Sequence, residues 1–419
     1  MLARYMAGAV AARTGDEMSG PALLVTGLAV TGSPLLASSV LAGLTVSAAV
    51  GGPLLGVLLD RARRPGRVLG WCLAGYAGGL LTVVGGMAAQ VPGAVLVGVA
   101  VVTGLLGPAL TGGWTAQLPL VAGPARLERA TAFDSMSYNV AGLAGPALVG
   151  VIASAGGGVM AALVSVAMLV AALPAAHGLP SAGSRSAAGE GGAPKAGGDG
   201  RAAGWRVVRE EVRAGFRVIA ANGVLRRATV ASMVSCCGLA MVVVSAPVLG
   251  ARLSGESGHG ALLLAVIAAG GLVANAMLSG TSRWAGSQAA GSQAAGLQAA
   301  GTAVLGAGVV VMACSQAYWM AVVGAAVAGA GEGPQLTALF AVRHREAPAR
   351  LRGQVFTTGA SLKITSFAIG SAVAGPLAAY SVSLALLTGA ALQAVAVAVL
   401  VVRRRTSAID AADTAAGGG

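Results

Sequence analysis

The chain has 419 residues, of which 56% are hydrophobic and 10% are charged, whereas an ordinary soluble domain carries about 25% charged residues. A soluble fold of this size could not bury so much apolar surface, so the composition excludes a soluble enzyme and indicates a protein that lies in lipid. The formal net charge of +13 would suggest a nucleic-acid partner for a soluble protein, but here the arginines stand between apolar runs and are topology signals.

Apolar runs long enough to cross a bilayer, about 20 residues each, recur along the chain. They predict an all-α polytopic membrane protein with twelve transmembrane helices in two six-helix bundles. No small-residue cleavage site follows the first run, so we expect a spanning helix there rather than a signal peptide. The predicted spans cover residues 5–30, 36–59, 68–88, 93–114, 130–154, 158–177, 224–250, 259–281, 297–315, 317–341, 354–379 and 382–402.

Three ionisable residues interrupt the first predicted span: Arg13, Asp16 and Glu17. Burying such groups in lipid is costly, so they are candidate functional residues. Arg13 precedes Asp16 by three residues and Glu17 by four, so it can pair with either carboxylate along one helix. At about 1.5 Å of rise per residue, both acids fall near the middle of the bilayer. We predict that one of them carries a coupled proton, and a static ion pair between helices is the alternative.

The second predicted span ends in a motif, Gly56-Val57-Leu58-Leu59-Asp60-Arg61, and the following loop reaches Gly66 and Arg67. This motif resembles the loop motif of the major facilitator superfamily, Gly-x-Leu-x-Asp-Arg followed by glycine and basic residues, although Gly66 and Arg67 are displaced. Gly56 would let a neighbouring helix approach, and Asp60 could accept hydrogen bonds from the amino end of another helix. The resemblance implies that Asp60 latches the two halves together. The arginines of the motif and the following loop also determine on which side of the membrane this loop lies. The corresponding site in the second half, residues 280–283, lacks the aspartate, which predicts a one-sided latch.

A second resemblance lies in the fifth predicted span, which is similar to the Gly-Pro motif of the superfamily's proton-driven drug exporters. The residues that carry it are Gly142, Gly145, Pro146 and Gly150. Glycine and proline bend a helix and permit tight contact with its neighbour. Residues 370–376 of the eleventh span are related, as expected for two repeated halves. One departure is that residues 93–113 contain no charge, whereas such exporters often carry an arginine in the fourth helix.

The polar segments divide the chain into an N-terminal bundle over 1–178, a cytoplasmic linker over 179–222, a C-terminal bundle over 223–403 and a disordered cytoplasmic tail over 404–419. Within the linker, residues at about 205–219 have the apolar period of an amphipathic helix. That helix would lie either on the membrane surface, with its arginines toward anionic headgroups, or on the protein's own cytoplasmic face. A five-residue repeat over 286–300 is interpreted as a neutral spacer in a loop.

Two further ionisable residues fall inside predicted spans of the second half: Glu332 in the tenth and Lys363 in the eleventh. Each lies roughly nine residues from the cytoplasmic end of its helix, so an ion pair that breaks and reforms as a cavity opens is plausible. The alternative is a static pair that holds the helices together. The resemblance implies that the first, fourth, seventh and tenth helices line a central cavity, which would place Asp16, Glu17 and Glu332 within reach of substrate or proton.

The arginines indicate which side of the membrane each loop faces. If the N-terminus is cytoplasmic, the outside loops hold Arg252 alone, and all other loop arginines are inside. We therefore expect a multi-pass protein of the bacterial cytoplasmic membrane with both termini in the cytoplasm.

The chain contains no phosphate-binding loop of the form GxxxxGK[ST], which excludes ATP as its energy source. Its three histidines are scattered and no cysteine spacing suits a metal, so we expect no cofactor, no metal and no enzymatic activity. The favoured function is proton-coupled export of small amphipathic molecules by alternating access. The expected partners are the substrate, protons and the lipid bilayer, without nucleic acid, and the expected state is a monomer. An importer of the same fold and an integral membrane enzyme remain alternatives.

Overall fold

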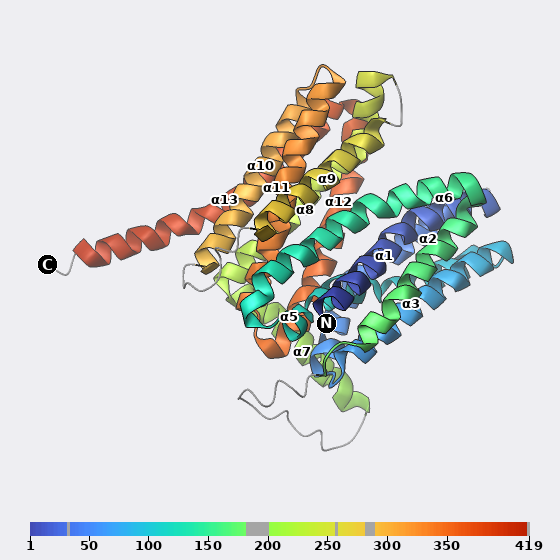
Figure 1. Ribbon diagram of the computed structural model, residues 1–419, viewed down its shortest axis with the longest axis horizontal. Helices are drawn as coiled ribbons and strands as arrows, with labels where there is room; N and C mark the ends of the chain where they lie inside the picture. Colours follow the sequence, from blue (N-terminus) through green and yellow to red (C-terminus); the bar gives the residue numbers. More distant parts are fainter. Residues whose placement is uncertain (32–33, 182–200, 256–258, 281–289, 417–419) are drawn as a thin grey trace. The chain divides into compact units, whose positions relative to one another are not determined.

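A computed structural model describes residues 1–31, 34–181, 201–255, 259–280 and 290–416 of the chain, which form helices and short connections (Figure 1). Most predicted spans become helices within a few residues of their expected ends. The helices are α1 (Leu2–Thr31), α2 (Pro34–Arg61), α3 (Pro65–Ala88), α4 (Gly93–Gly104), the π-helix η1 (Ala109–Gly113), α5 (Leu118–Ala122), the 3₁₀ helix η2 (Pro124–Arg126), α6 (Leu127–His177), α7 (Arg201–Ala221), α8 (Gly223–Ser254), α9 (His259–Gly280), α10 (Ala290–Ala313), α11 (Tyr318–Glu346), the 3₁₀ helix η4 (Ala349–Leu351), α12 (Arg352–Tyr380) and α13 (Val382–Ala416).

Ten helical stretches within the described residues are long and apolar enough to cross a membrane. The fifth and sixth predicted spans are both within α6, which is interrupted at Gly157, where φ is 82°. Only glycine adopts this backbone conformation readily, so the interruption falls where the sequence predicted a connection. Two of the predicted spans, α1 and α11, are outside this set, and they carry ionisable residues along their length, Asp16 and Glu17 in α1 and Glu332 in α11. With these two, the described helices account for the twelve predicted spans.

The fourth predicted span is not one regular helix. After α4 the chain makes a turn at residues 105–106 and then forms the π-helix η1. Pro108 immediately precedes η1 and lacks the backbone N–H that a regular helix needs. Gly104 lies so close to α2 that a Cβ there would collide with the Leu44 carbonyl oxygen. Single π turns inside membrane helices are frequent near functional residues.

The helices divide into two compact units. The first unit contains residues 1–130, 140–221 and 347–364, and the second contains 131–139, 222–346 and 365–419. This division differs from the predicted halves, 1–178 and 223–403, because the start of α6 belongs to the second unit and the start of α12 to the first. Two continuous helices are therefore each shared between the units.

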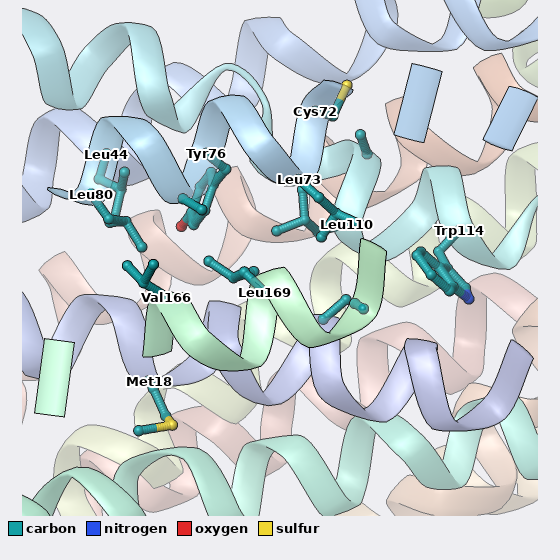
Figure 2. Close-up of a cluster of buried hydrophobic side chains, with 14 of the residues drawn as sticks. Met18, Leu44, Cys72, Leu73, Tyr76, Leu80, Leu110, Trp114, Val166 and Leu169 are labelled. Atoms are coloured by element: carbon teal, nitrogen blue, oxygen red, sulfur yellow. The ribbon is translucent and has the colours of Figure 1, made fainter. Parts of the chain in front are cut away.

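The core of the first unit is built from α1, α2, α3, the fourth span and mainly the second part of α6 (Figure 2). Large apolar side chains meet there with almost no exposed surface; those labelled in the figure include Met18, Leu73, Leu80, Leu110 and Leu169. A second core joins α8, α9, α10, α11 and α13, which run alongside one another in the second unit (Figure 1). In lipid these cores are held mainly by close packing of side chains rather than by removal of apolar surface from water.

One expectation about the polar segments was wrong. Residues 290–300 of the five-residue repeat begin α10 rather than lying in a loop; residues 281–289 fall outside the described residues. This segment is rich in alanine, a strong helix former. Helix α13 extends to Ala416, and the disorder of residues 404–419 stays a prediction.

Candidate functional site

Asp16 lies in the middle of α1 and is partly buried in the first unit. The Tyr76 hydroxyl of α3 donates a hydrogen bond to its carboxylate. The hydroxyl oxygens of Tyr76 and Ser19 lie 3.0 Å apart and share a further hydrogen bond. Tyr76 and Ser19 are themselves buried, so a small polar cluster stands inside an otherwise apolar core. Figure 2 shows Tyr76 among the apolar side chains of this core. A carboxylate in such surroundings can be held and oriented while it gains or loses a proton.

Glu17, the next residue along α1, points in a different direction and is exposed. Its Cβ lies where α1 meets α6 at Gly145. A Cβ added to Gly145 would stand 2.7 Å from the Glu17 Cβ and 3.1 Å from its carbonyl carbon. The acidic pair and the Gly-Pro motif, predicted as separate elements, are therefore in contact.

The other residues of the Gly-Pro motif are placed differently. A Cβ added to Gly142 or Gly150 would meet nothing within 4 Å among the described residues, and Pro146 is exposed. Close helix approach therefore requires glycine at position 145 and not at the other two positions.

Arg13 is 1% exposed, and its Nη2 donates a hydrogen bond of 2.8 Å to the Thr115 hydroxyl. Thr115 lies two residues after η1, so this contact joins α1 to the irregular fourth span. The prediction that Arg13 pairs with Asp16 or Glu17 stays a prediction.

Asp60, the single acidic residue of α2, lies against the amino end of α12. Its carboxylate accepts hydrogen bonds from the backbone N–H groups of Gly353 at 2.7 Å and Gln354 at 2.8 Å. A carboxylate is favoured there because the first N–H groups of a helix lack partners within the helix and carry partial positive charge. Gly56 makes the approach possible, since a Cβ there would stand 2.5 Å from the Thr357 hydroxyl oxygen.

One turn further along the same contact, the Gly52 N–H donates to the Ser361 hydroxyl at 3.1 Å, and Ser361 donates to the Ala48 carbonyl. The α2–α12 contact within the first unit is thus polar over three turns.

The linker helix α7 also joins this contact. Arg61 forms an ion pair with Glu211 in which Nη2 and Oε1 are 2.5 Å apart. The Gln354 side-chain amide donates to the Glu211 carbonyl oxygen at 2.7 Å, and Gly215 approaches the same side chain. Of the two predicted placements for the amphipathic helix, these contacts support packing on the protein itself.

The remaining predicted residues lie elsewhere. Gly66 is buried against the end of α6, and Arg67 is exposed, so neither takes part in the α12 contact. Glu332 is partly buried in the second unit and Lys363 is partly buried in the first. Their ion pair stays a prediction.

Sequence reasoning missed Tyr76, Ser19, Thr115 and Gln354. The available signal was weak: each is a polar residue within or beside an apolar run, and none belongs to a motif. Their importance follows from which helices pack together, which single-sequence patterns do not specify.

Comparisons with known proteins agree with this architecture. The chain matches the Major Facilitator Superfamily over residues 5–357. Its fold is similar to that of the human organic anion transporter MFSD10, with a TM-score of 0.71, 15% identity, and coverage of 95% of this chain and 99% of that one. It is also similar to a bacterial homologue of the iron transporter ferroportin (TM-score 0.68, 16% identity, 96% and 98% covered) and to the proton:xylose symporter XylE (TM-score 0.68, 14% identity, 94% of both chains). No curated protein matches by sequence.

Proposed function

Because the chain belongs to the Major Facilitator Superfamily, we propose that this multi-pass secondary transporter exports small amphipathic molecules in exchange for protons. The family and the similar solved structures are transporters rather than enzymes. The proposal adds three things to that assignment: the direction of transport, the coupled ion and the class of substrate.

The observation that carries the proposal is the acidic pair in α1. Ionisable side chains within membrane helices are expensive and mark ion or proton pathways. Asp16 is held by the Tyr76 hydroxyl, whereas Glu17 lies at the contact between α1 and α6. One carboxylate is thus positioned by a hydroxyl and its neighbour lies against a second helix, which suits a group that takes up a proton on one side of the membrane and releases it on the other.

Export, rather than import, is supported by the contact between Glu17 and Gly145. The Gly-Pro motif resembles that of proton-driven exporters, and in this chain its central glycine, Gly145, packs directly on Glu17. A bend and close contact at this point would couple the protonation state of the α1 carboxylates to the position of α6. The class of substrate, small amphipathic molecules, is proposed from the resemblance to those exporters.

The proposal includes the protein's location. We propose that it is a monomer in a bacterial cytoplasmic membrane. Both termini are proposed to lie in the cytoplasm, because the arginines are concentrated in alternate loops. Reporter fusions at the two termini test the orientation, and a terminus found outside contradicts it.

Efflux of a panel of fluorescent amphipathic compounds from cells tests the function. Cells expressing the wild type, Asp16→Asn or Glu17→Gln are compared with and without a protonophore, and Glu210→Gln, at an exposed residue of α7, is the matched control. We expect efflux by the wild type and the control that stops with the protonophore, and loss of efflux in both α1 variants. Uptake of compounds instead of efflux would support the importer of the same fold, and normal efflux in both α1 variants would contradict the coupling role.

A further inference from the structure

Three contacts between oxygen atoms link α1 to α3 around Asp16. The Tyr76 hydroxyl is hydrogen-bonded to the Asp16 side-chain carboxyl group. The hydroxyl oxygens of Tyr76 and Ser19 are 3.0 Å apart, and the Ser19 hydroxyl oxygen is 2.6 Å from the backbone carbonyl oxygen of Asp16. Since the third contact returns to the residue of the first, the three contacts form a closed ring. Tyr76 and Ser19 are each 3% exposed, so bulk water does not replace these contacts.

The number of hydrogens available to the ring depends on the charge of Asp16. Each contact needs one hydrogen, the two hydroxyls carry one each, and an ionised carboxylate carries none. With Asp16 ionised, Tyr76 donates to the carboxylate and Ser19 donates to the Asp16 carbonyl oxygen, so the contact between the two hydroxyls has no hydrogen. With Asp16 neutral, its O–H donates to Tyr76, Tyr76 donates to Ser19, and Ser19 donates to the carbonyl oxygen. Only the neutral carboxyl group completes the ring.

Loss of the proton from Asp16 therefore changes how α1 packs on α3. The proton that leaves is the one on the Asp16 carboxyl group, and Tyr76 and Ser19 keep theirs. Tyr76 turns its hydrogen from Ser19 to the carboxylate, and the two hydroxyl oxygens then face each other with lone pairs only. Two such oxygens repel each other at 3.0 Å, so this contact between the helices has to open.

Glu17 lacks such an arrangement. Its carboxylate has no hydrogen-bond partner among the residues that the structure describes, and its Cβ lies at the contact of α1 with Gly145 of α6. A proton on Glu17 would therefore complete no hydrogen bond that the ionised form lacks. The two neighbouring acids differ in this respect, although the sequence presents them as equivalent.

Few other ionisable groups surround the ring. On α1 the nearest are Arg13 and Glu17, and α3 adds Cys72, one turn before Tyr76. The other helices of the first unit contribute none over residues 34–59, 93–122 and 140–176, which contain no ionisable side chain. None of these segments brings a second carboxyl group or a base to the ring, so the third hydrogen comes from Asp16.

We propose that Asp16, rather than Glu17, carries the coupled proton, and that Tyr76 and Ser19 are positioning residues that hold this proton by completing the ring. This assignment rests on the proposed exchange of substrate for protons and names the carrier within the acidic pair. Glu17 then serves coupling through its contact with α6. Because α1 and α3 both belong to the first unit, release of the proton acts first on the packing inside that unit.

Infrared spectroscopy of the purified full-length protein in lipid nanodiscs tests the choice of carrier, because a protonated carboxyl group has a C=O stretching band that a carboxylate lacks. The band is followed from acidic to alkaline buffer in the wild type, Asp16→Asn and Glu17→Gln. We expect Asp16→Asn to lose one component of the band, here called the Asp16 component, and Glu17→Gln to retain it. A band that is complete in Asp16→Asn, or the loss of the same component in Glu17→Gln, would overturn the assignment.

Ser19→Ala and Tyr76→Phe test the ring itself. Ser19→Ala leaves the contact between Asp16 and Tyr76, which the Tyr76 hydrogen fills when Asp16 is ionised. The ratio of protonated to ionised Asp16 at a given pH should then fall about fivefold, the change expected when one hydrogen bond of ordinary strength no longer depends on the proton. Tyr76→Phe removes the acceptor of the Asp16 O–H, so the Asp16 component should move to higher frequency.

Ser165→Ala and Tyr5→Phe are the matched controls, because each removes a buried hydroxyl that joins α1 to another segment outside the ring. The Ser165 hydroxyl donates to the Gly15 carbonyl oxygen at 2.7 Å, and the Tyr5 hydroxyl donates to the Trp114 carbonyl oxygen at 3.1 Å. Both variants should leave the Asp16 component unchanged, even if their melting temperatures fall.

An Asp16 component that is unchanged in both Ser19→Ala and Tyr76→Phe, or that changes equally in the controls, would contradict the role of the ring. Ser19→Ala keeps the test decisive if Tyr76→Phe does not fold. The spectra need no substrate, so wild-type protein that exports no tested compound would contradict the proposed function alone. Protonophore-sensitive efflux by a protein without an Asp16 component would contradict this assignment and leave the proposed function intact.

Discussion

The backbone N–H of Gln354 donates a 2.8 Å hydrogen bond to the Asp60 carboxylate, joining residues that are 294 positions apart in the chain. Gly353 donates a second bond to the other carboxylate oxygen. The carboxylate therefore serves as the amino-terminal cap of a helix to which it does not belong. Helix α12 is shared between the two units, and this cap holds the first three turns of α12 against α2 in the first unit.

Replacing Asp60 should weaken the contact in proportion to what is removed. Asp60→Ala loses the charge and both acceptors, at a cost of about 0.5–2 kcal/mol for a lost helix cap, whereas Asp60→Asn keeps one acceptor and should have an intermediate effect. The corresponding change in an equilibrium that depends on the contact is roughly 2- to 30-fold. Initial transport rates and melting temperatures check this order, and a fully active Asp60→Ala protein would contradict the latch.

The glycines of the Gly-Pro motif should differ sharply from one another. Gly145→Ala places a Cβ 2.7 Å from the Glu17 Cβ, and overpacking of this kind costs about 1–3 kcal/mol. Gly142→Ala and Gly150→Ala meet open space and serve as matched controls, which should be neutral or slightly stabilising. Melting temperature and export are the measurements. Equal losses at all three positions would show that the motif acts through flexibility rather than through close contact.

The ion pair between Arg61 and Glu211 should control docking of α7 more than overall stability. The two side chains are 49% and 34% exposed, and exposed pairs contribute about 1 kcal/mol or less. Arg209, Arg213 and Arg217 are exposed on α7 and provide trypsin sites. Glu211→Gln should increase cleavage there a few-fold, whereas Glu210→Gln should not. Restoration of slow cleavage after Arg213 and Arg217 by combining Arg61→Glu with Glu211→Arg, with cleavage at the new Arg counted separately, would identify the pair itself as the cause.

The repeat that begins α10 contains one glutamine that matters for stability. Gln298 is fully buried and its side-chain amide donates to the Ala228 carbonyl at 3.1 Å, whereas Gln293 is exposed on the same helix. Gln298→Ala should destabilise the protein by about 1–3 kcal/mol, the cost of losing a buried hydrogen bond, and Gln293→Ala should have little effect. Thermal unfolding of the purified variants distinguishes them, and identical melting temperatures would restore the interpretation of the repeat as a spacer.

The helices could be predicted because lipid imposes a length and an apolar composition that a single sequence displays directly. The capping role of Asp60 was also predictable, since a carboxylate at a helix end in a loop motif implies a partner with free N–H groups. Tyr76 and Thr115 were not predictable as partners of Asp16 and Arg13, because they lie far away in the chain and their contacts depend on helix rotation. Gln298 falls inside the predicted span 297–315, but its buried contact with Ala228 has no local signal, because it depends on which face of α10 packs against α8. The division of α6 and α12 between units has no local signal, since it depends on tertiary packing alone.

Substrate-dependent proton movement in proteoliposomes tests the central claim most directly. The purified wild type, Asp16→Asn and Glu17→Gln are reconstituted with a trapped pH-sensitive dye, and a compound exported by cells is added under an imposed pH gradient. The account predicts proton flow with the wild type only when the compound is present, and none in either variant at equal protein content. Substrate movement by the wild type without proton flow, or undiminished proton flow in both variants, would contradict coupling through the acidic pair of α1.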